Sequence, residues 1–287
     1  NRPDILQRKG LYAPPKGASK RLGLEVSGKI KKIGKKVKNL KINQKVCALV
    51  HGGGYAEYCK VFYKHVLPIP KGMDFIEAAA IPENFFTVWY NLFERGQIKK
   101  SDTILIHGGS SGIGTAAIQL CKAHGCKVIT TVSNKKKQLY CKKLGADFAV
   151  DYNKSNFLEV ITKYTKNKGV DIILDMVGQK YFEKNILLLK DKGKLIMIAF
   201  LSGSITKADF TAIMTKRLIL TGSTLRPRTD QEKAKIAKNL HKSYWTAFTK
   251  KTIKPNIYKI FNLKDAFKAH KLMESSKHLG KIVLKTK

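Results

Sequence analysis

A glycine-rich loop at residues 107–117 is the part of the sequence best suited to bind a reactant. Its order is His-Gly-Gly-Ser-Ser-Gly-Ile-Gly-Thr-Ala-Ala, in which Gly112, Gly114 and Ala117 match Gly-x-Gly-x-x-Gly/Ala. The match follows a strand-like apolar run and opens an amphipathic helix, the context that a dinucleotide-binding loop requires. Glycines allow a tight turn and a close approach to the pyrophosphate, whose charge the helix N-terminus attracts. The loop predicts a dinucleotide site that includes Gly109 and Ser111.

The same loop also fits a different chemistry. The stretch Gly108-Gly-Ser110-Ser-Gly112 matches Gly-x-Ser-x-Gly, the nucleophile elbow of α/β-hydrolases. A hydrolase would need a later acid and a later histidine at strand ends, and Asp175 does end an expected strand. The later histidines, however, lie in lysine-rich segments of helical pattern: His241, His270 and His278. The dinucleotide interpretation is therefore favoured.

The choice of dinucleotide follows from the end of the next expected strand. NAD enzymes carry Asp or Glu about 20 residues after the first glycine, where the carboxylate binds the ribose 2′-hydroxyl. Here the strand ends Val-Ser133-Asn134-Lys-Lys-Lys137, with three cations and no acid. A carboxylate would repel a 2′-phosphate, whereas Ser133, Asn134 and Lys137 can bind one. The sequence predicts NADPH as cofactor.

The elements around this loop predict an α/β protein with a doubly wound parallel sheet, because apolar strands alternate with amphipathic helices after residue 102. Strands are expected at 103–107, 127–132, 148–152, 170–177, 194–200 and 218–223, and helices at 113–124, 135–144, 157–165 and 181–189. The sequence pattern of residues 22–70 predicts short strands and turns, and a helix is expected at 85–93. The tail has helical pattern at 230–249 and 263–276 and a strand at 281–285, so both chain ends are expected to build one domain.

Composition excludes several classes of protein. The chain has 287 residues, and neither a run of 18 apolar residues nor an apolar leader at Asn1–Arg8 is present. We therefore expect no membrane partner. The five cysteines are odd in number and form no Cys-x-x-Cys pair, which favours a reducing compartment over disulfides or a structural zinc lobe. We expect a cytoplasmic protein.

The formal net charge of +36 raises an alternative of another class, a basic nucleic-acid-binding protein. The segment 29–38, Lys-Ile-Lys-Lys-Ile-Gly-Lys-Lys-Val-Lys, would provide a basic patch. The sequence has only seven arginines, although base and phosphate recognition favours arginine, and it contains no motif of a nucleic-acid-binding fold. A general lysine bias explains the charge equally well, so nucleic acid is not the expected partner.

Several stretches of the chain resemble the zinc-free medium-chain dehydrogenase/reductases of the zeta-crystallin-like NADPH:quinone oxidoreductase group. They are residues 1–15, 23–28 (Gly-Leu-Glu-Val-Ser-Gly), 53–58 (Gly-Gly-Tyr-Ala-Glu-Tyr), 77–83, 109–119 and 280–284. The resemblance implies a GroES-like β-rich catalytic domain at 1–86 and 223–287 and a Rossmann NADP-binding domain at 87–222. It also implies that opening strands of the catalytic domain precede Asn1 in such proteins, so we expect the chain to be N-terminally truncated.

The resemblance further implies roles for individual residues. Tyr12 and Asn1 would lie at the nicotinamide and substrate, in a cleft between the domains, and Thr87 would contact the nicotinamide side. Gly112, Ile113 and Gly114 would hold the pyrophosphate. Ser133, Lys137 and Tyr152 would surround the adenosine 2′-phosphate end, and Phe200, Thr224 and Leu225 would line the cofactor groove. Zinc-dependent relatives have Gly-His-Glu where this chain has Gly23-Leu24-Glu25, so no metal is expected.

The function implied is hydride transfer from NADPH to a quinone or another conjugated carbonyl. Such a transfer needs alignment of the reactants and stabilisation of the developing oxyanion, for which Tyr12 or Asn1 would donate a hydrogen bond. Reduction of enoyl thioesters or enones uses the same cofactor half and remains an alternative. Because relatives of this group are often homodimers, we also expect a homodimer.

Overall fold

The computed structural model describes residues 1–286, and the chain divides into two compact units. One unit combines Asn1–Thr87 with Leu225–Lys287, and the other comprises Val88–Thr224. We call them the terminal unit and the central unit. The first division falls inside helix α3 (Pro82–Val88), which continues directly as the π-helical segment η2 (Trp89–Arg95).

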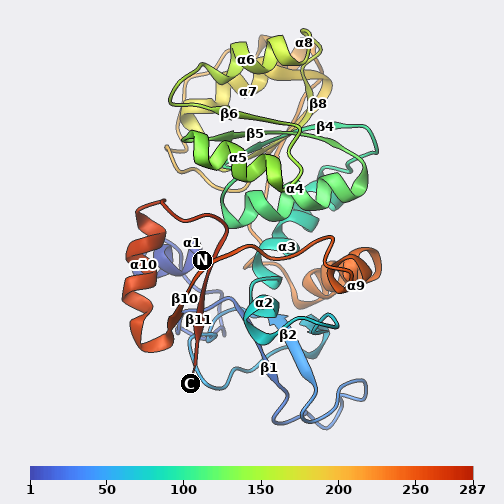
Figure 1. Ribbon diagram of the computed structural model, residues 1–287, viewed down its shortest axis with the longest axis vertical. Coiled ribbons are helices and arrows are strands. Elements are labelled where there is room, and N and C mark those ends of the chain that lie inside the picture. The colour runs from blue at the N-terminus through green and yellow to red at the C-terminus, as the bar shows by residue number, and fades with distance from the viewer. Residues whose placement is uncertain (287) are drawn as a thin grey trace. The chain divides into compact units, whose positions relative to one another are not determined.

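The central unit is built on one six-stranded parallel sheet with strand order β6-β5-β4-β7-β8-β9. Its strands are β4 (Thr103–His107), β5 (Lys127–Val132), β6 (Phe148–Asp151), β7 (Val170–Asp175), β8 (Leu189–Met197) and β9 (Ile219–Gly222). Its helices are α4 (Gly112–His124), α5 (Lys135–Lys143), α6 (Phe157–Tyr164), η3 (Gln179–Tyr181), α7 (Phe182–Leu188) and α8 (Thr211–Thr215). Helices α4 and α5 lie on one side of the sheet and α6 and α7 on the other (Figure 1). This strand order and two-sided covering define the doubly wound Rossmann fold that the sequence predicts.

The apolar character of the strands explains the sheet. Leu105, Ile129, Ile173 and Leu195 come from four neighbouring strands, and each is essentially inaccessible to solvent. Strands buried on both faces have nearly continuous apolar sequences, which is why the segments between residues 103 and 197 were recognisable as strands of a parallel sheet.

The terminal unit contains two small sheets. An antiparallel sheet has the order β1-β2-β3, and a parallel pair joins β10 to β11. The strands are β1 (Glu25–Lys29), β2 (Lys45–Leu49), β3 (Val66–Pro68), β10 (Ile257–Asn262) and β11 (Lys281–Lys285). The helices are α1 (Arg2–Arg8), η1 (Tyr63–His65), α2 (Phe75–Ala79), α3, α9 (Asp230–Thr249), η4 (Leu263–Asp265) and α10 (Ala266–Glu274). Within the described residues, none of the helices is both long and apolar enough to cross a membrane.

Within the segment 22–70, for which the sequence predicts short strands and turns, residues 55–58 form no strand, and the glycines next to them explain why. Gly23 has φ +99°, and a Cβ atom there would lie 2.5 Å from the Tyr55 nitrogen. The Gly54 and Tyr55 amides donate instead to the carbonyls of Gly23 and Leu22. Two irregular segments are therefore held backbone to backbone, and no strand forms.

Candidate functional site

The glycine loop of the central unit leads from β4 directly into α4. Ser111 caps the helix, because its hydroxyl accepts a hydrogen bond from the Gly114 amide at 3.0 Å. The turn itself is made at Gly108, which has φ +70°, and not at Gly112, the first helical residue. Among the described residues the amides of Gly112 and Ile113, at the start of α4, remain available to an anion, as at other helix N-termini that bind phosphate.

Two glycines of the loop are required by packing. A Cβ atom on Gly114 would lie 2.4 Å from the Gly108 carbonyl oxygen, and one on Gly109 would lie 1.9 Å from the Thr130 hydroxyl. Because real Cβ atoms essentially never approach so closely, the loop can lie against α4 and β5 only with glycine at these positions. Ile113, between Gly112 and Gly114, is half-buried in the first turn.

The end of β5 carries the polar residues predicted for the 2′-phosphate. The Lys137 ammonium donates to the Ser133 hydroxyl at 3.1 Å, and the Asn134 side chain caps α5 by accepting from the Lys137 amide. Partial burial lowers the pKa of Lys137 from its ordinary value. The side-chain amide of Asn153 donates to the Ser133 backbone carbonyl and fixes the adjoining loop. The structure therefore brings Ser133, Asn134 and Lys137 together.

The remaining cofactor candidates lie on separate segments. Tyr152 follows β6, with its ring 6.3 Å from that of Tyr181, and its side chain is exposed. Phe200 follows β8 and is also exposed, while Thr224 is exposed at the last position of the central unit. Thr87 is half-buried in α3.

The two catalytic candidates have different surroundings in the terminal unit. The Asn1 side chain is fully engaged, since it donates to Glu25 at 2.8 Å and accepts from the Lys281 ammonium at 2.6 Å. Tyr12 lies under a guanidinium, with the Arg226 Cζ atom 5.6 Å from the ring centre. Burial, and next the charge of Glu83, raise the pKa of Tyr12, while Arg226 lowers it. Tyr12 therefore keeps its proton and is the better hydrogen-bond donor of the two.

An acidic pair that the sequence analysis did not identify lies next to these residues. Glu25 accepts from the Glu83 backbone amide at 2.9 Å and forms an ion pair with the buried Lys281. Burial, and next the Glu25 charge, raise the pKa of Glu83 to about 7, despite the opposing effect of Lys281. A carboxyl group that titrates near neutral pH can act as a general acid.

Leu24 stands where zinc-dependent dehydrogenases have a histidine that binds the metal, and leucine cannot be a ligand. Leu24 is buried and apolar, and the oxygens of the neighbouring Glu25 already bind Asn1, Lys281 and the Glu83 amide. Zinc requires three or four N, S or O ligands with a free lone pair. These residues do not fit a catalytic zinc ion.

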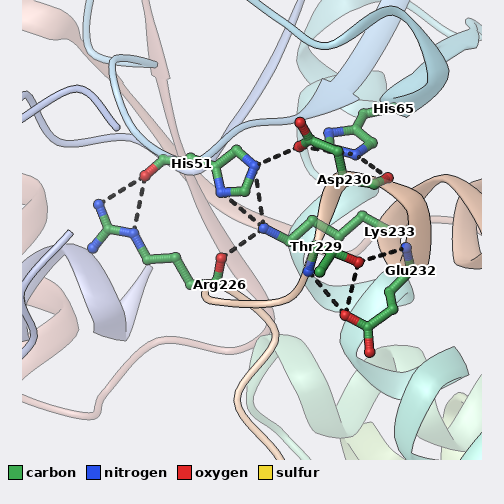
Figure 2. A network of polar contacts seen from close by, with 7 residues as sticks. All are labelled: His51, His65, Arg226, Thr229, Asp230, Glu232 and Lys233. Atoms are coloured by element: carbon green, nitrogen blue, oxygen red, sulfur yellow. Dashed lines mark hydrogen bonds and ion pairs between the residues drawn. The ribbon is translucent and has the colours of Figure 1, made fainter. Parts of the chain in front are cut away.

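A second polar network surrounds His51, between β2 and the first turn of α9 (Figure 2). The buried Lys233 ammonium donates to His51 Nδ1 at 2.9 Å and to the Arg226 carbonyl at 2.6 Å. The Arg226 guanidinium in turn donates through Nε and Nη2 to the His51 carbonyl, at 3.0 and 2.9 Å. The network thus fixes Arg226, and with it the cation above Tyr12.

His51, His65 and Asp230 are also close enough to suggest a metal site within the described part of the chain. The hydrogen bonds oppose this interpretation. His65 Nε2 lies 2.9 Å from the Asp230 carbonyl, which can only accept, so this nitrogen carries a proton. His51 Nδ1 accepts from Lys233, so His51 Nε2 donates its proton to the Asp230 carboxylate at 2.8 Å. Neither Nε2 atom has a lone pair for a metal ion.

The serine-hydrolase interpretation has no support in the geometry. Ser110 is buried in the central unit, where a nucleophile elbow would expose its serine. Within the central unit, His107 is bonded to Thr131 and Asn185, and Asp175 accepts from the amides of Val177 and Gly178. Within the described central unit, His107 and Asp175 are therefore engaged with groups other than Ser110, and a triad needs a histidine on the serine.

Comparison with known proteins identifies the relatives of the chain. The family described as alcohol dehydrogenase GroES-like domain matches residues 1–71, and the family described as zinc-binding dehydrogenase matches residues 112–241. Quinone oxidoreductase of Rattus norvegicus is 29% identical over 279 residues, which cover 96% of this chain and 83% of the relative. Synaptic vesicle membrane protein VAT-1 homolog of Danio rerio is 34% identical over 193 residues, 67% of this chain and 40% of the relative.

The fold has close counterparts among solved structures. Escherichia coli quinone oxidoreductase complexed with NADPH superposes with a TM-score of 0.87 at 28% sequence identity. The match covers 99% of this chain and 87% of that one. The α/β fold with a GroES-like part and a parallel Rossmann sheet is therefore confirmed.

Proposed function

Because the chain belongs to the zinc-free medium-chain dehydrogenase/reductases of the quinone oxidoreductase group, we propose that it reduces quinones with NADPH without a metal ion. The observation that carries this proposal is the end of β5, where Lys137 and Ser133 meet in the place of the acidic residue of NAD enzymes. The named quinone oxidoreductases among the relatives support the choice of acceptor.

In this proposal the central unit holds the cofactor. The loop at Gly109–Gly114 and the first turn of α4 bind the pyrophosphate, and Ser133, Asn134 and Lys137 bind the 2′-phosphate, with Tyr152, Phe200, Thr224 and Thr87 as further contacts. Bound NADPH would supply the hydride. Tyr12 donates a hydrogen bond to the acceptor oxygen, and Asn1 positions Glu25 and Lys281.

The test is oxidation of NADPH by the purified protein with a panel of 1,4-quinones, enones and enoyl thioesters. We expect turnover with quinones and a preference for NADPH over NADH. Turnover with enoyl thioesters alone would replace the proposed acceptor, and no turnover with any of them would refute the activity.

We also propose a homodimer formed through the central unit. β9 is an edge strand of the six-stranded sheet, and the apolar side chains of Phe210, Met214 and Ile219 on or near it are exposed. Apolar edges of this kind are usually covered by a partner. Light scattering should give twice the mass of the chain, and a monomeric mass would refute the proposal.

We propose a cytoplasmic location on separate grounds. All five cysteines are free thiols, four of them buried, as is usual in a reducing compartment. A fluorescent fusion of the complete gene product would test it, and labelling of an oxidising compartment would refute it.

A further inference from the structure

The link between β1 and β2 in the terminal unit carries a dense cluster of positive charge. Eight of the 17 residues at 29–45 are lysine, whereas Lys and Arg together account for 56 of the 287 residues of the chain. The sequence has no Asp or Glu from residue 26 to residue 56. A general lysine bias therefore does not explain the local density. We call residues 29–45 the basic hairpin; its lysines are Lys29, Lys31, Lys32, Lys35, Lys36, Lys38, Lys41 and Lys45.

The fold turns these charges outward and provides no counter-ions for them. All eight lysines are exposed, whereas four of the apolar residues between them are half-buried: Ile30, Ile33, Val37 and Leu40. Within the described residues, none of the eight takes part in an ion pair. Lys29 and Lys45 are even direct cross-strand neighbours, and like charges at such positions destabilise a sheet. A charge cluster that folding disfavours points to a role in binding an anion-rich partner.

The backbone of the basic hairpin is held where it joins the strands, which can be followed in Figure 1. The Ile30 amide donates to the Gln44 carbonyl at 3.1 Å, and the Asn43 amide donates to the Ile30 carbonyl at 2.8 Å. Asn43, with φ +66°, makes the tight turn. Ile42 precedes it and is 60% exposed, although it is a large apolar residue. The hairpin therefore presents its lysines together with one exposed apolar side chain.

The composition of the basic hairpin distinguishes between the polyanions that could bind it. It contains no arginine and no aromatic residue. Nucleic-acid binding favours arginine for phosphates and base edges and aromatic rings for stacking on bases. A lipid surface needs only charge, and clusters of about four to eight lysines or arginines bind the anionic leaflet that faces the cytoplasm. An exposed apolar side chain beside such a cluster adds a second contact with the lipid.

We propose that the basic hairpin docks the protein on an anionic phospholipid membrane, with the lysines against the headgroups and Ile42 in the interface. Docking of this kind needs no membrane-spanning helix. The expectation of no membrane partner, which rested on the lack of a long apolar run, therefore does not apply to it. The inference is independent of the proposed reductase activity.

The experiment measures sedimentation of the purified chain with vesicles of phosphatidylcholine, alone or mixed with phosphatidylserine. Binding should require phosphatidylserine and weaken as salt is raised. A quadruple variant of the hairpin should bind at least about 50-fold more weakly, since each lysine near an anionic surface contributes about fivefold. Its substitutions are Lys31→Gln, Lys32→Gln, Lys35→Gln and Lys36→Gln. Ile42→Gln, which keeps all the lysines, should weaken binding about fivefold.

The matched control removes four exposed lysines on or next to α9 in the same unit: Lys235→Gln, Lys238→Gln, Lys242→Gln and Lys250→Gln. It should bind vesicles like the wild type. Both quadruple variants should unfold at or above the wild-type Tm, because repulsion between lysines only decreases.

Three outcomes would overturn the inference. Wild-type binding that does not depend on phosphatidylserine would remove the anionic surface as partner. Equal loss in the two quadruple variants would indicate an effect of net charge rather than of the hairpin. Binding to polyuridylate RNA that is tighter than binding to vesicles, and that only the hairpin variant loses, would assign the basic hairpin to nucleic acid instead.

Discussion

Replacing Gly114 by alanine tests whether the glycine loop is held by packing. The added Cβ would lie 2.4 Å from the Gly108 carbonyl oxygen and 2.6 Å from the Gly109 Cα and carbonyl carbon. All three are backbone atoms, which cannot rotate away, so the loop must shift by about 1 Å to reach ordinary van der Waals contact. We expect the free energy of unfolding to fall by about 3 kcal/mol, near the upper end for overpacking substitutions, and Tm to fall by about 6–12 °C.

The same shift moves the loop that would hold the pyrophosphate. We therefore expect at least tenfold weaker binding of NADPH by fluorescence titration, alongside the lower Tm in a thermal scan. Gly28→Ala is the matched control, because a Cβ at Gly28 meets no atom within 4 Å. If Gly114→Ala unfolded at the wild-type temperature and bound NADPH as tightly as Gly28→Ala, the packing argument would be wrong.

Three further predictions concern single charged residues. Lys137→Met should weaken NADPH binding about tenfold and leave NADH binding unchanged, as lost contact with a 2′-phosphate requires; equal loss for both cofactors in titration would contradict this. The free energy of unfolding should fall as pH rises from 4.5 to 7, because folded Glu83 holds a proton that the unfolded chain releases, and urea titrations of Glu83→Gln should lack this component. Burial lowers the pKa of Lys233 to about 8 from 10.5, so the folded state loses its proton first and stability should rise between these pH values. Lys233→Met should remove that rise and cost about 1–3 kcal/mol at pH 7, since the Arg226 carbonyl loses its donor; an unchanged urea midpoint would refute the role of this lysine.

The central unit was predictable from the sequence, because the residues that define its strands and its candidate cofactor site are close together in the chain. The strands 103–107 and 127–132 occur with the expected bounds, and Ser133, Asn134 and Lys137 meet because they are close in sequence at one strand end. The bounds of helix 230–249 were likewise predictable from its periodicity and capping residues. In contrast, α1 and β10 were missed, since a seven-residue helix and a six-residue strand with mostly exposed residues have little periodic pattern.

The polar contacts of the terminal unit were not predictable, because they join distant parts of the chain. Arg226 and Lys233 look like two of many cations in a sequence of net charge +36, yet both are buried and meet His51, which lies 175 or more residues away. Glu83 likewise appears as an ordinary acid at the start of a helix. Only the folded arrangement reveals that Glu25 accepts from its backbone amide.

Burial and the neighbouring Glu25 carboxylate distinguish Glu83 from the other acids of the terminal unit. A lysine or arginine that donated to the Glu83 carboxylate would hold the pKa of Glu83 low, as a salt bridge does. Asn1 and Glu25 occupy Lys281, and the His51 and Arg226 carbonyls occupy Arg226 and Lys233. These hydrogen bonds direct the cations to acceptors other than Glu83, and the buried Arg226 Nη1 atom has no partner among the described residues. Lys233 is a cation whose charge interacts with Glu83, so Lys233→Met should raise the pKa of Glu83 further, and a carboxyl titration followed by NMR should move to higher pH; an unmoved titration would contradict the coupling of the two groups.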